Sequence, residues 1–165
     1  IFRRAATSMT ITESDDSQVT NNSLPSGERA MLIGFLYAGS ETLGNEACHA
    51  SLSSDGRFLL VANYNGANPS GYPDAALTVF PLGGEGTFGP PTASVRHTGS
   101  GPNRERQSTA HAHCVVQSPV GETVYVSDLG IDKLVAYSLD DTGGLTRQPA
   151  RDFAFPPGLG PRPPS

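Results

Sequence analysis

The chain carries an internal repeat, and this repeat narrows the choice of fold more than any other feature of the sequence. Residues 49–63 and 113–128 place apolar and turn residues in the same order, with one residue inserted in the second copy. In both copies a second apolar strand follows, at 76–82 and at 133–139, and then a glycine-rich turn with a single apolar residue. Such repetition is typical of architectures in which each copy is one supersecondary unit that stacks on its neighbour.

Each copy predicts four short antiparallel strands, in the order strand, turn, strand, loop, strand, glycine turn, strand. Four such strands in about 40 to 50 residues are typical of a β-propeller blade, which buries its faces by stacking on other blades. The copies lie further apart than this period because of the loop at 68–74 and the stretch at 99–110. A β-sandwich with two similar halves is the alternative, but the matching order of turns as well as strands favours the propeller. The sequence therefore predicts an all-β fold, a partial β-propeller of about two four-stranded antiparallel blades.

The composition agrees with an all-β chain and excludes some classes of partner. The 165 residues include 19 glycines and 14 prolines but only 16% charged residues, which favours short strands and tight turns over helices. The net charge of −5 provides no basic field for nucleic acid, and no window of about 18 apolar residues exists to span a membrane. Cys48 and Cys114 each stand at the start of an apolar strand, where a free buried thiol is common and a disulfide less common. We therefore expect neither a nucleic-acid partner nor a membrane span.

The chain divides into four parts. Residues 1–29 are rich in Ser, Thr, Asn and Asp and form a leader that we expect to be disordered or non-native. Residues 30–48 predict the last strand of a preceding blade, residues 49–112 one blade with a long loop, and residues 113–165 a second blade with the start of the next. Two blades cannot close a ring and the chain begins with Ile rather than Met, so we expect a fragment that is poorly stable or self-associates through its unpaired edges.

A cluster of polar residues precedes the first strand of the second blade. The loop at 101–107 includes Asn103 and Arg106, and His111 and His113 follow it. Loops that lead into propeller strands line the central channel, so these residues are the best candidates for a site. Residues two apart in a strand face the same side, so both imidazoles can reach one ligand.

The histidine pair has three interpretations. It can supply a general base with an orienting partner, two metal ligands, or packing and hydrogen bonding at the junction between blades. A zinc site needs a third and usually a fourth ligand, and the neighbouring Cys114 is expected on the opposite face of the strand. We therefore expect no metal and no cofactor. Asp128 and Asn63, at equivalent positions after a buried strand, are expected to cap their own turns rather than to react.

Several segments occur together in a pattern that resembles one known family. They are the loop Gly101-Pro-Asn-x-x-Arg-Gln, the pair His111-x-His113, the segment 124–130 and, in the first copy, Cys48-His49, 55–57 and 62–64. This pattern is similar to the 6-phosphogluconolactonases and carboxymuconate cyclases, which are seven-bladed propellers, and it spans about residues 32–162. The resemblance implies a ring of seven blades and a cytoplasmic, metal-free enzyme of carbohydrate metabolism that hydrolyses a sugar-phosphate lactone such as 6-phosphogluconolactone. The alternative is a relative that closes or opens a carboxymuconate lactone, because the fold alone does not decide the substrate.

The resemblance also suggests which residues act on the lactone. Attack by water needs a base and a group that stabilises the negative charge developing on the carbonyl oxygen. We expect His113 to be the base and Arg162 to stabilise the charge, while Asn103, Arg106 and His111 bind the phosphate or carboxylate of the substrate. Arg162 lies in a Gly-Pro-Arg stretch similar to the family's Gly-Pro-Arg-His, with Pro163 at the histidine position.

A non-catalytic propeller that serves as an interaction platform is the second class of function. Its binding loops would carry exposed aromatic anchors, whereas the loops here carry Arg, His and Asn, which favours the enzyme. A site at the central channel draws residues from several blades, so we expect this chain alone to be inactive.

Overall fold

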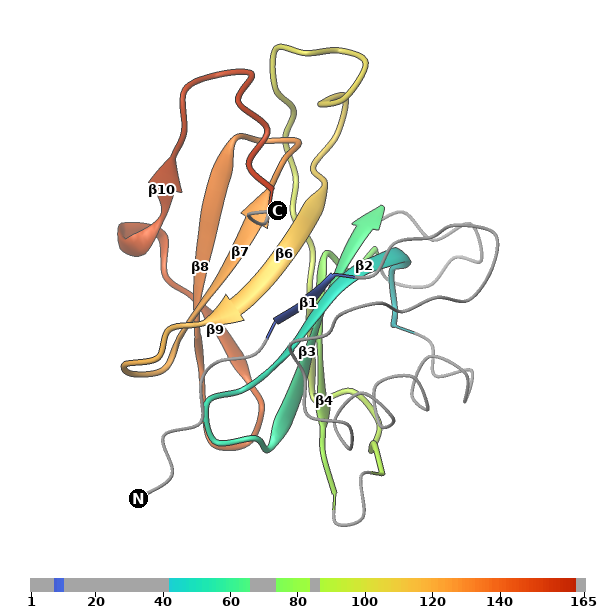
Figure 1. Cartoon of the computed structure of the whole chain (residues 1–165), viewed down its shortest axis with the longest axis vertical. Helices are drawn as coiled ribbons and strands as arrows, with labels where there is room; N and C mark the ends of the chain where they lie inside the picture. The colour runs from blue at the N-terminus through green and yellow to red at the C-terminus, as the bar shows by residue number, and fades with distance from the viewer. Residues whose placement is uncertain (1–7, 11–41, 66–73, 84–86, 163–165) are drawn as a thin grey trace.

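Each copy of the repeat folds into its own antiparallel sheet (Figure 1). The computed structural model describes residues 8–10, 42–65, 74–83 and 87–162. The first sheet has the strand order β1-β2-β3-β4-β5, and the second has the order β10-β8-β7-β6, with β9 also paired to β8. The two blade-like sheets that the repeat predicts are therefore confirmed.

The first sheet is a meander of consecutive strands. Its strands are β1 (Ser8–Thr10), β2 (Asn45–Leu52), β3 (Phe58–Asn65), β4 (Leu77–Pro81) and β5 (Ala93–Val95). A tight turn joins β2 to β3, in which the Ser53 hydroxyl accepts the Phe58 amide at 2.9 Å. Gly56 in this turn has φ 73°, a conformation that glycine adopts without steric cost. Ser53 and Gly56 thus form the turn that the repeat predicts between the first two strands of this blade.

The second sheet repeats this arrangement but divides its outer strand. Its strands are β6 (Ala112–Gln117), β7 (Thr123–Asp128), β8 (Lys133–Leu139), β9 (Leu145–Arg147) and β10 (Phe153–Ala154). Strands β9 and β10 pair with opposite ends of β8, and a short 3₁₀ helix at Pro149–Arg151 separates them. Pro149 has no amide proton to continue the ladder, which explains why the outer strand breaks there.

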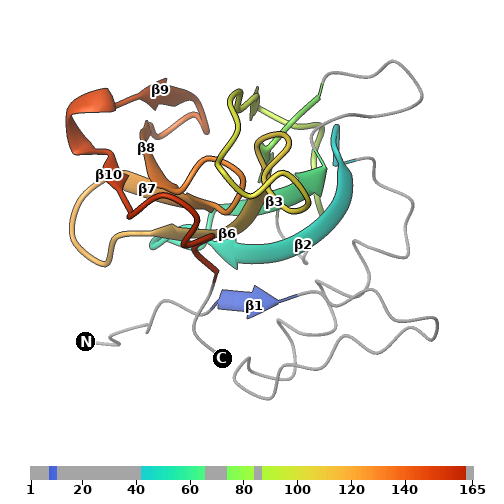
Figure 2. The same ribbon diagram turned by 90° about the horizontal axis from the view of Figure 1, so that it is seen from above.

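The core lies between the two sheets, where β2 and β3 pack against β6 (Figure 2). One buried cluster draws on both sheets and contains Phe58, Leu60, Ala62, Leu77 and Val79 with Val115, Val124, Val126, Val135, Tyr137 and Leu139. A second cluster, built on Ala50, Leu59, Val61 and Phe80, lies on the other face of the first sheet because neighbouring strand residues alternate. Each fully buried Leu or Val contributes about 1.5 to 3 kcal/mol, so these clusters provide most of the stabilisation.

Hydrogen bonds also join the two sheets. The Ser51 hydroxyl donates to the Val115 carbonyl at 2.9 Å, and the Thr92 hydroxyl donates to the Gly143 carbonyl at 3.1 Å. The contacts run from the inner strands to the outer turns, so the two sheets hold a defined relative position. This fixed position is what brings residues of the first sheet beside the predicted site residues of the second.

Two observations differ from the predicted organisation of the N-terminal part. Residues 8–10, expected to be unstructured within the leader, form β1 and pair antiparallel with β2. An inner edge strand such as β2 exposes unpaired backbone groups, and pairing with β1 satisfies them. Strand β2 begins at Asn45, so residues 45–48 belong to the same strand as His49. The other residues of the leader lie outside the described residues. Most of the strand that was predicted within residues 30–48 also lies outside them.

Candidate active site

The two predicted histidines meet at an aromatic side chain of the neighbouring sheet. His111 directly precedes β6, and His113 sits where the register of β6 with β7 shifts. The ring of Tyr64, near the end of β3, stacks on His111 with centroids 4.4 Å apart and an interplanar angle of 16°. The same ring meets His113 edge-on, with centroids 5.7 Å apart and an angle of 86°. Tyr64 therefore brings both imidazoles to one place at the junction between the sheets.

His111 is held in one orientation by hydrogen bonds to both ring nitrogens. It is 8% exposed, and its Nδ1 lies 3.1 Å from the carbonyl oxygen of Tyr64. A carbonyl only accepts, so Nδ1 carries a proton, and Nε2 lies within hydrogen-bond distance of the Thr109 hydroxyl at 3.3 Å. With both nitrogens engaged, His111 suits an orienting or binding role rather than that of a base.

His113 differs from His111 because its ring is not engaged in this way. Its Nδ1 is buried, and neither ring nitrogen has a hydrogen-bond partner among the residues that the structure describes. An unpaired buried polar atom is costly, and such groups mark places that a ligand or water completes. His113 is therefore the imidazole of this pair that can take a proton.

A third histidine, His49, lies beneath the pair and is fully buried. Its Nδ1 accepts the Val115 amide at 3.3 Å, so its proton is on Nε2, which faces the Cys114 sulfur at 3.5 Å. Burial, and secondarily the nearby His113, lower the pKa of His49 to about 4. His49 is therefore a neutral packing residue. The sequence marked it as a repeat position and as part of the family-like Cys48-His49 pair.

The two cysteines are not joined to each other in a disulfide. Burial raises the pKa of Cys114 to about 11, so it stays protonated and is a poor nucleophile. The Cys48 thiol donates toward the Ala112 carbonyl at 3.3 Å, across the junction between the sheets. Both thiols are half-buried rather than fully buried as the sequence suggested.

The loop at 101–107 is a compact turn. The side-chain oxygen of Asn103 accepts the amides of Glu105 and Arg106 at 3.1 and 3.3 Å, which is an Asx turn. This oxygen shapes the loop, and the amide nitrogen of Asn103 is the atom left for a ligand. The side chain of Arg106 is exposed, with no ion pair to any residue in the described part of the chain.

A buried carboxylate ties this loop to the C-terminal segment. The Gln107 side chain is 1% exposed and donates to Asp132 Oδ1 at 2.8 Å. Asp132 also accepts the amides of Gly158 and Gly160, both at 2.7 Å. Burial alone would raise the pKa of Asp132, but the hydrogen bonds from Gly160, Gly158 and Gln107 outweigh it and hold the pKa below its ordinary value. The loop and the segment that leads to Arg162 are thus held together.

The structure does not bring every predicted residue into contact. Arg162 is exposed, directly after the buried Pro161. No hydrogen bond or ion pair within the described ranges joins Arg162, Arg106 or Asn103 to His113. His111 and His113 therefore form the assembled part of the site, and the other predicted residues lie on two segments that Asp132 connects.

Asp128 has the turn-capping role that the sequence predicts, whereas the same prediction is wrong for Asn63. Asp128 Oδ1 accepts the amides of Gly130 at 3.0 Å and of His111 at 2.8 Å, and it thereby positions His111. Asn63 lies within β3, and its side chain donates to the carbonyls of Ala75 at 3.0 Å and Thr42 at 3.2 Å, which belong to other segments of the chain. The side-chain oxygen of Asn63 has no hydrogen-bond partner among the described residues, so Asn63 joins neighbouring segments rather than capping its own turn.

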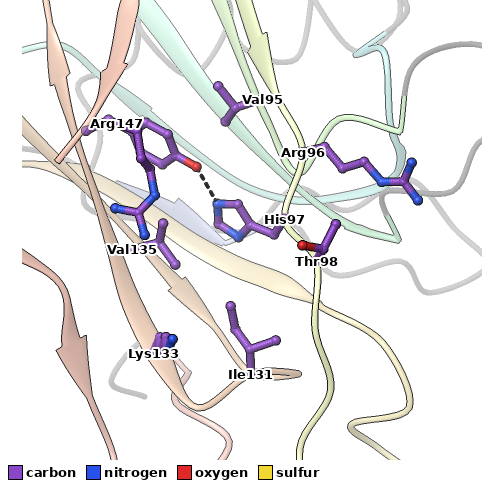
Figure 3. Close-up of a pocket in the computed structure, with 9 residues that line it drawn as sticks. Val95, Arg96, His97, Thr98, Ile131, Lys133, Val135 and Arg147 are labelled. Carbon is purple, nitrogen blue, oxygen red and sulfur yellow. Dashed lines mark hydrogen bonds between the residues drawn. The ribbon is translucent and has the colours of Figure 1, made fainter. Parts of the chain in front are cut away.

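A second feature beside Asp128 was not predicted. Asp128 Oδ2 lies 2.6 Å from His97 Nδ1, and His97 Nε2 lies 2.9 Å from the Tyr137 hydroxyl. The side chains of His97 and Asp128 are almost completely buried. Next to them is an open pocket of about 480 Å³, shown in Figure 3. None of the five predicted site residues lines this pocket.

The described residues contain no group of three His, Cys, Asp or Glu side chains that could hold a metal ion. They also contain no helix that is long and apolar enough to cross a membrane.

Comparison with known proteins assigns the fold to one class, the β-propeller lactonases. Residues 10–163 match the family described as "Lactonase, 7-bladed beta-propeller", and the chain belongs to this family. It is 39% identical over 119 residues to the 6-phosphogluconolactonase of Bacillus subtilis (strain 168), covering 72% of this chain and 31% of that protein. The chain thus spans about one third of the length of this relative.

Solved structures give the same result. A protein of Bacteroides fragilis proposed to be a 6-phosphogluconolactonase superposes with a TM-score of 0.62 and 31% identity, over 74% of this chain and 33% of that one. The periplasmic gluconolactonase of Pseudomonas aeruginosa superposes with a TM-score of 0.58 and 32% identity, over 68% and 30%. The two sheets are therefore blades of a partial seven-bladed propeller, as the sequence predicts.

Proposed function

We propose that this chain is part of an enzyme that hydrolyses a sugar-phosphate lactone such as 6-phosphogluconolactone. Family membership and the names of the relatives support a lactonase. The observation that carries the assignment of the site is the unpaired ring of His113 next to the fully hydrogen-bonded ring of His111.

The proposed reaction is base-assisted attack of water on the lactone carbonyl. His113 accepts a proton from water while the water oxygen bonds to the carbonyl carbon, and negative charge develops on the carbonyl oxygen. The ring C–O bond then breaks, and the imidazolium of His113 returns its proton to the departing oxygen. The products are the open-chain hydroxy acid and the regenerated imidazole, so no oxidant or metal is consumed.

The remaining residues have supporting roles in this proposal. The ring of Tyr64 limits the orientation of both imidazoles, since it stacks on one and meets the other edge-on. Arg106 and the amide nitrogen of Asn103 bind the substrate phosphate from the exposed loop, and Arg162 approaches the developing negative charge. Asp132 keeps these two segments in a fixed relation through its three hydrogen bonds.

The substrate is tested with the protein expressed from its full reading frame. Hydrolysis is measured with 6-phosphogluconolactone, with gluconolactone, which lacks the phosphate, and with carboxymuconate lactone. We expect 6-phosphogluconolactone to be preferred, and Arg106→Gln to raise KM for it by about tenfold because one charge-assisted hydrogen bond is lost. The same variant should leave KM for gluconolactone unchanged.

Three results would contradict the proposal. Faster turnover of carboxymuconate lactone would favour the lactonising alternative. Equal KM values for the two sugar lactones would show that the phosphate group does not contribute to substrate binding. Absence of turnover with all three lactones would favour a non-catalytic propeller.

A further inference from the structure

The pocket next to His97 lies at a seam between the two sheets, away from the histidine pair. One wall is the segment Val95–Thr98, which begins at the last residue of β5 in the first sheet. The other wall is formed by β8 and β9 of the second sheet (Figure 3). Both walls belong to the described chain, so the shape of the pocket does not depend on the proposed lactone site.

The floor of the pocket combines apolar side chains with the polar groups of Tyr137 and His97. Lys133, Val135 and Tyr137 alternate along β8 and so share one face of the sheet. Val135 and Tyr137 are both 3% exposed. The Tyr137 hydroxyl and the ring of His97 are the polar groups within this apolar surface, and Ile131 and Val95 complete the lining.

The polar groups of the floor are fixed by the buried Asp128. Its carboxylate accepts from His97 Nδ1 at 2.6 Å, and His97 Nε2 lies within hydrogen-bond distance of the Tyr137 hydroxyl at 2.9 Å. Burial raises the pKa of Tyr137 to about 12, so the phenol stays protonated. The floor therefore offers a ligand one hydroxyl oxygen and no exposed carboxylate, because the oxygens of Asp128 are used by His97, His111 and Gly130.

The charges at the rim decide which ligand the pocket suits. Arg147 lies over the Tyr137 ring at 5.5 Å, but Asp152 pairs with both of its terminal nitrogens at 2.7 and 2.5 Å. Arg96 pairs with Asp74 at 3.1 Å, and its guanidinium points away from the pocket (Figure 3). Lys133 is exposed, and no carboxylate of the described residues lies within ion-pair distance of it. The charge of Asp152 also acts on Lys133 from beyond ion-pair distance, so Arg147, Lys133 and Asp152 together leave this rim with one excess positive charge.

We propose that this pocket binds a small monocarboxylate with a compact apolar body. The carboxylate contacts the Lys133 ammonium, and the apolar body lies on Val135 and Ile131. Phosphate as a dianion carries two negative charges, whereas the rim offers one excess positive charge. The free energy lost when the dianion leaves water would therefore be poorly offset by attraction to the rim. The site is separate from the proposed lactone site and does not rest on that assignment.

The test is isothermal titration of the full-reading-frame protein with benzoate. Benzamide, which has the same shape without the charge, and inorganic phosphate are the matched ligands. We expect saturable binding of benzoate that is tighter than binding of either control. Lys133→Gln should raise the Kd for benzoate about tenfold, since it removes one charge-assisted contact.

Two further variants keep the test decisive. Arg96→Gln, which removes a cation that points away from the pocket, should leave the Kd unchanged. Thr98→Trp adds a large side chain at the exposed rim and should abolish binding, and it serves as the test if Lys133→Gln proves unstable. Lactone hydrolysis by both variants should match that of the parent protein.

The proposal would be overturned by any of four results. These are no saturable benzoate binding up to the solubility limit, equal affinity for benzamide, equal affinity for phosphate, or an unchanged Kd in both Lys133→Gln and Thr98→Trp.

Discussion

Substitution of Asp132 by Asn tests whether this carboxylate holds the loop at 101–107 to the C-terminal segment. Asp132 Oδ1 accepts from Gln107 and Gly160, and Oδ2 accepts from Gly158. Asn keeps one oxygen and tolerates the left-handed backbone that Asp132 adopts at φ 53°. Its NH₂ group, however, would face a backbone N–H donor where the carboxylate accepts. One charge-assisted hydrogen bond is lost, which we expect to destabilise the protein by about 2 kcal/mol at neutral pH.

The pH dependence of this loss has a definite sign. The pKa of Asp132 is lower in the folded protein than its ordinary value of 3.8. Its stabilisation is therefore fully present above pH 3.8 and declines as the pH falls toward the folded-state pKa. The difference between the parent protein and Asp132→Asn should be full at pH 7 and shrink in acid.

Urea denaturation and amide hydrogen exchange measure the effect. We expect faster exchange at Gly158 and Gly160 in Asp132→Asn, and little change in Asp141→Asn, an exposed carboxylate matched in chemistry. Unchanged exchange at both glycines, or a stability difference that persists undiminished below pH 3.8, would refute the assignment of Asp132 as the connecting residue.

Two other outcomes follow from buried contacts. Because His49 has a pKa of about 4 when folded and 6.5 as its ordinary value, stability should fall by about 3 kcal/mol as the pH drops from 6.5 to 4. Denaturation of His49→Gln across that range should show a smaller loss, and an equal loss would contradict the burial argument. A Cβ at Gly130 would clash with the Thr109 carbonyl oxygen, whereas one at Gly121 meets open space and adds only the backbone strain of its φ of 84°. Gly130→Ala should therefore lower Tm by more than Gly121→Ala, and the reverse order would show that the chain after Asp128 is not as tightly packed as described.

The sequence predicted the sheets well because the repeat encodes local pairing. Each strand of a meander pairs with the next one along the chain, so apolar runs and turn residues suffice to place it. The pairing of β1 with β2 could not be predicted in this way, since Ser8–Thr10 has no apolar pattern and its partner lies far along the chain. The break between β9 and β10 is marked in the sequence only by Pro149.

The site was predicted less completely because its contacts cross between sheets. The histidine pair was visible as His111-x-His113, and the structure does bring these rings together. The contact with Tyr64 depends on how β3 of one sheet packs against the start of β6 of the other, which no local pattern encodes. His97 is a lone histidine in a loop without a counterpart in the repeat, so its hydrogen bonds to Asp128 and Tyr137 left no signal.

The most direct test of the account is the rate of 6-phosphogluconolactone hydrolysis by His113→Ala in the full-reading-frame protein, measured together with Tm. His97→Gln is the control, because it changes a buried histidine outside the proposed site. Loss of a general base should lower kcat by about 10² to 10⁴. We predict this fall in kcat for His113→Ala, with a Tm close to that of the parent protein. His97→Gln should lower Tm but keep the same kcat per folded molecule. Near-full turnover by His113→Ala, or a loss of activity that only follows unfolding, would contradict the assignment of His113 as the base and would favour a packing role at the junction between blades.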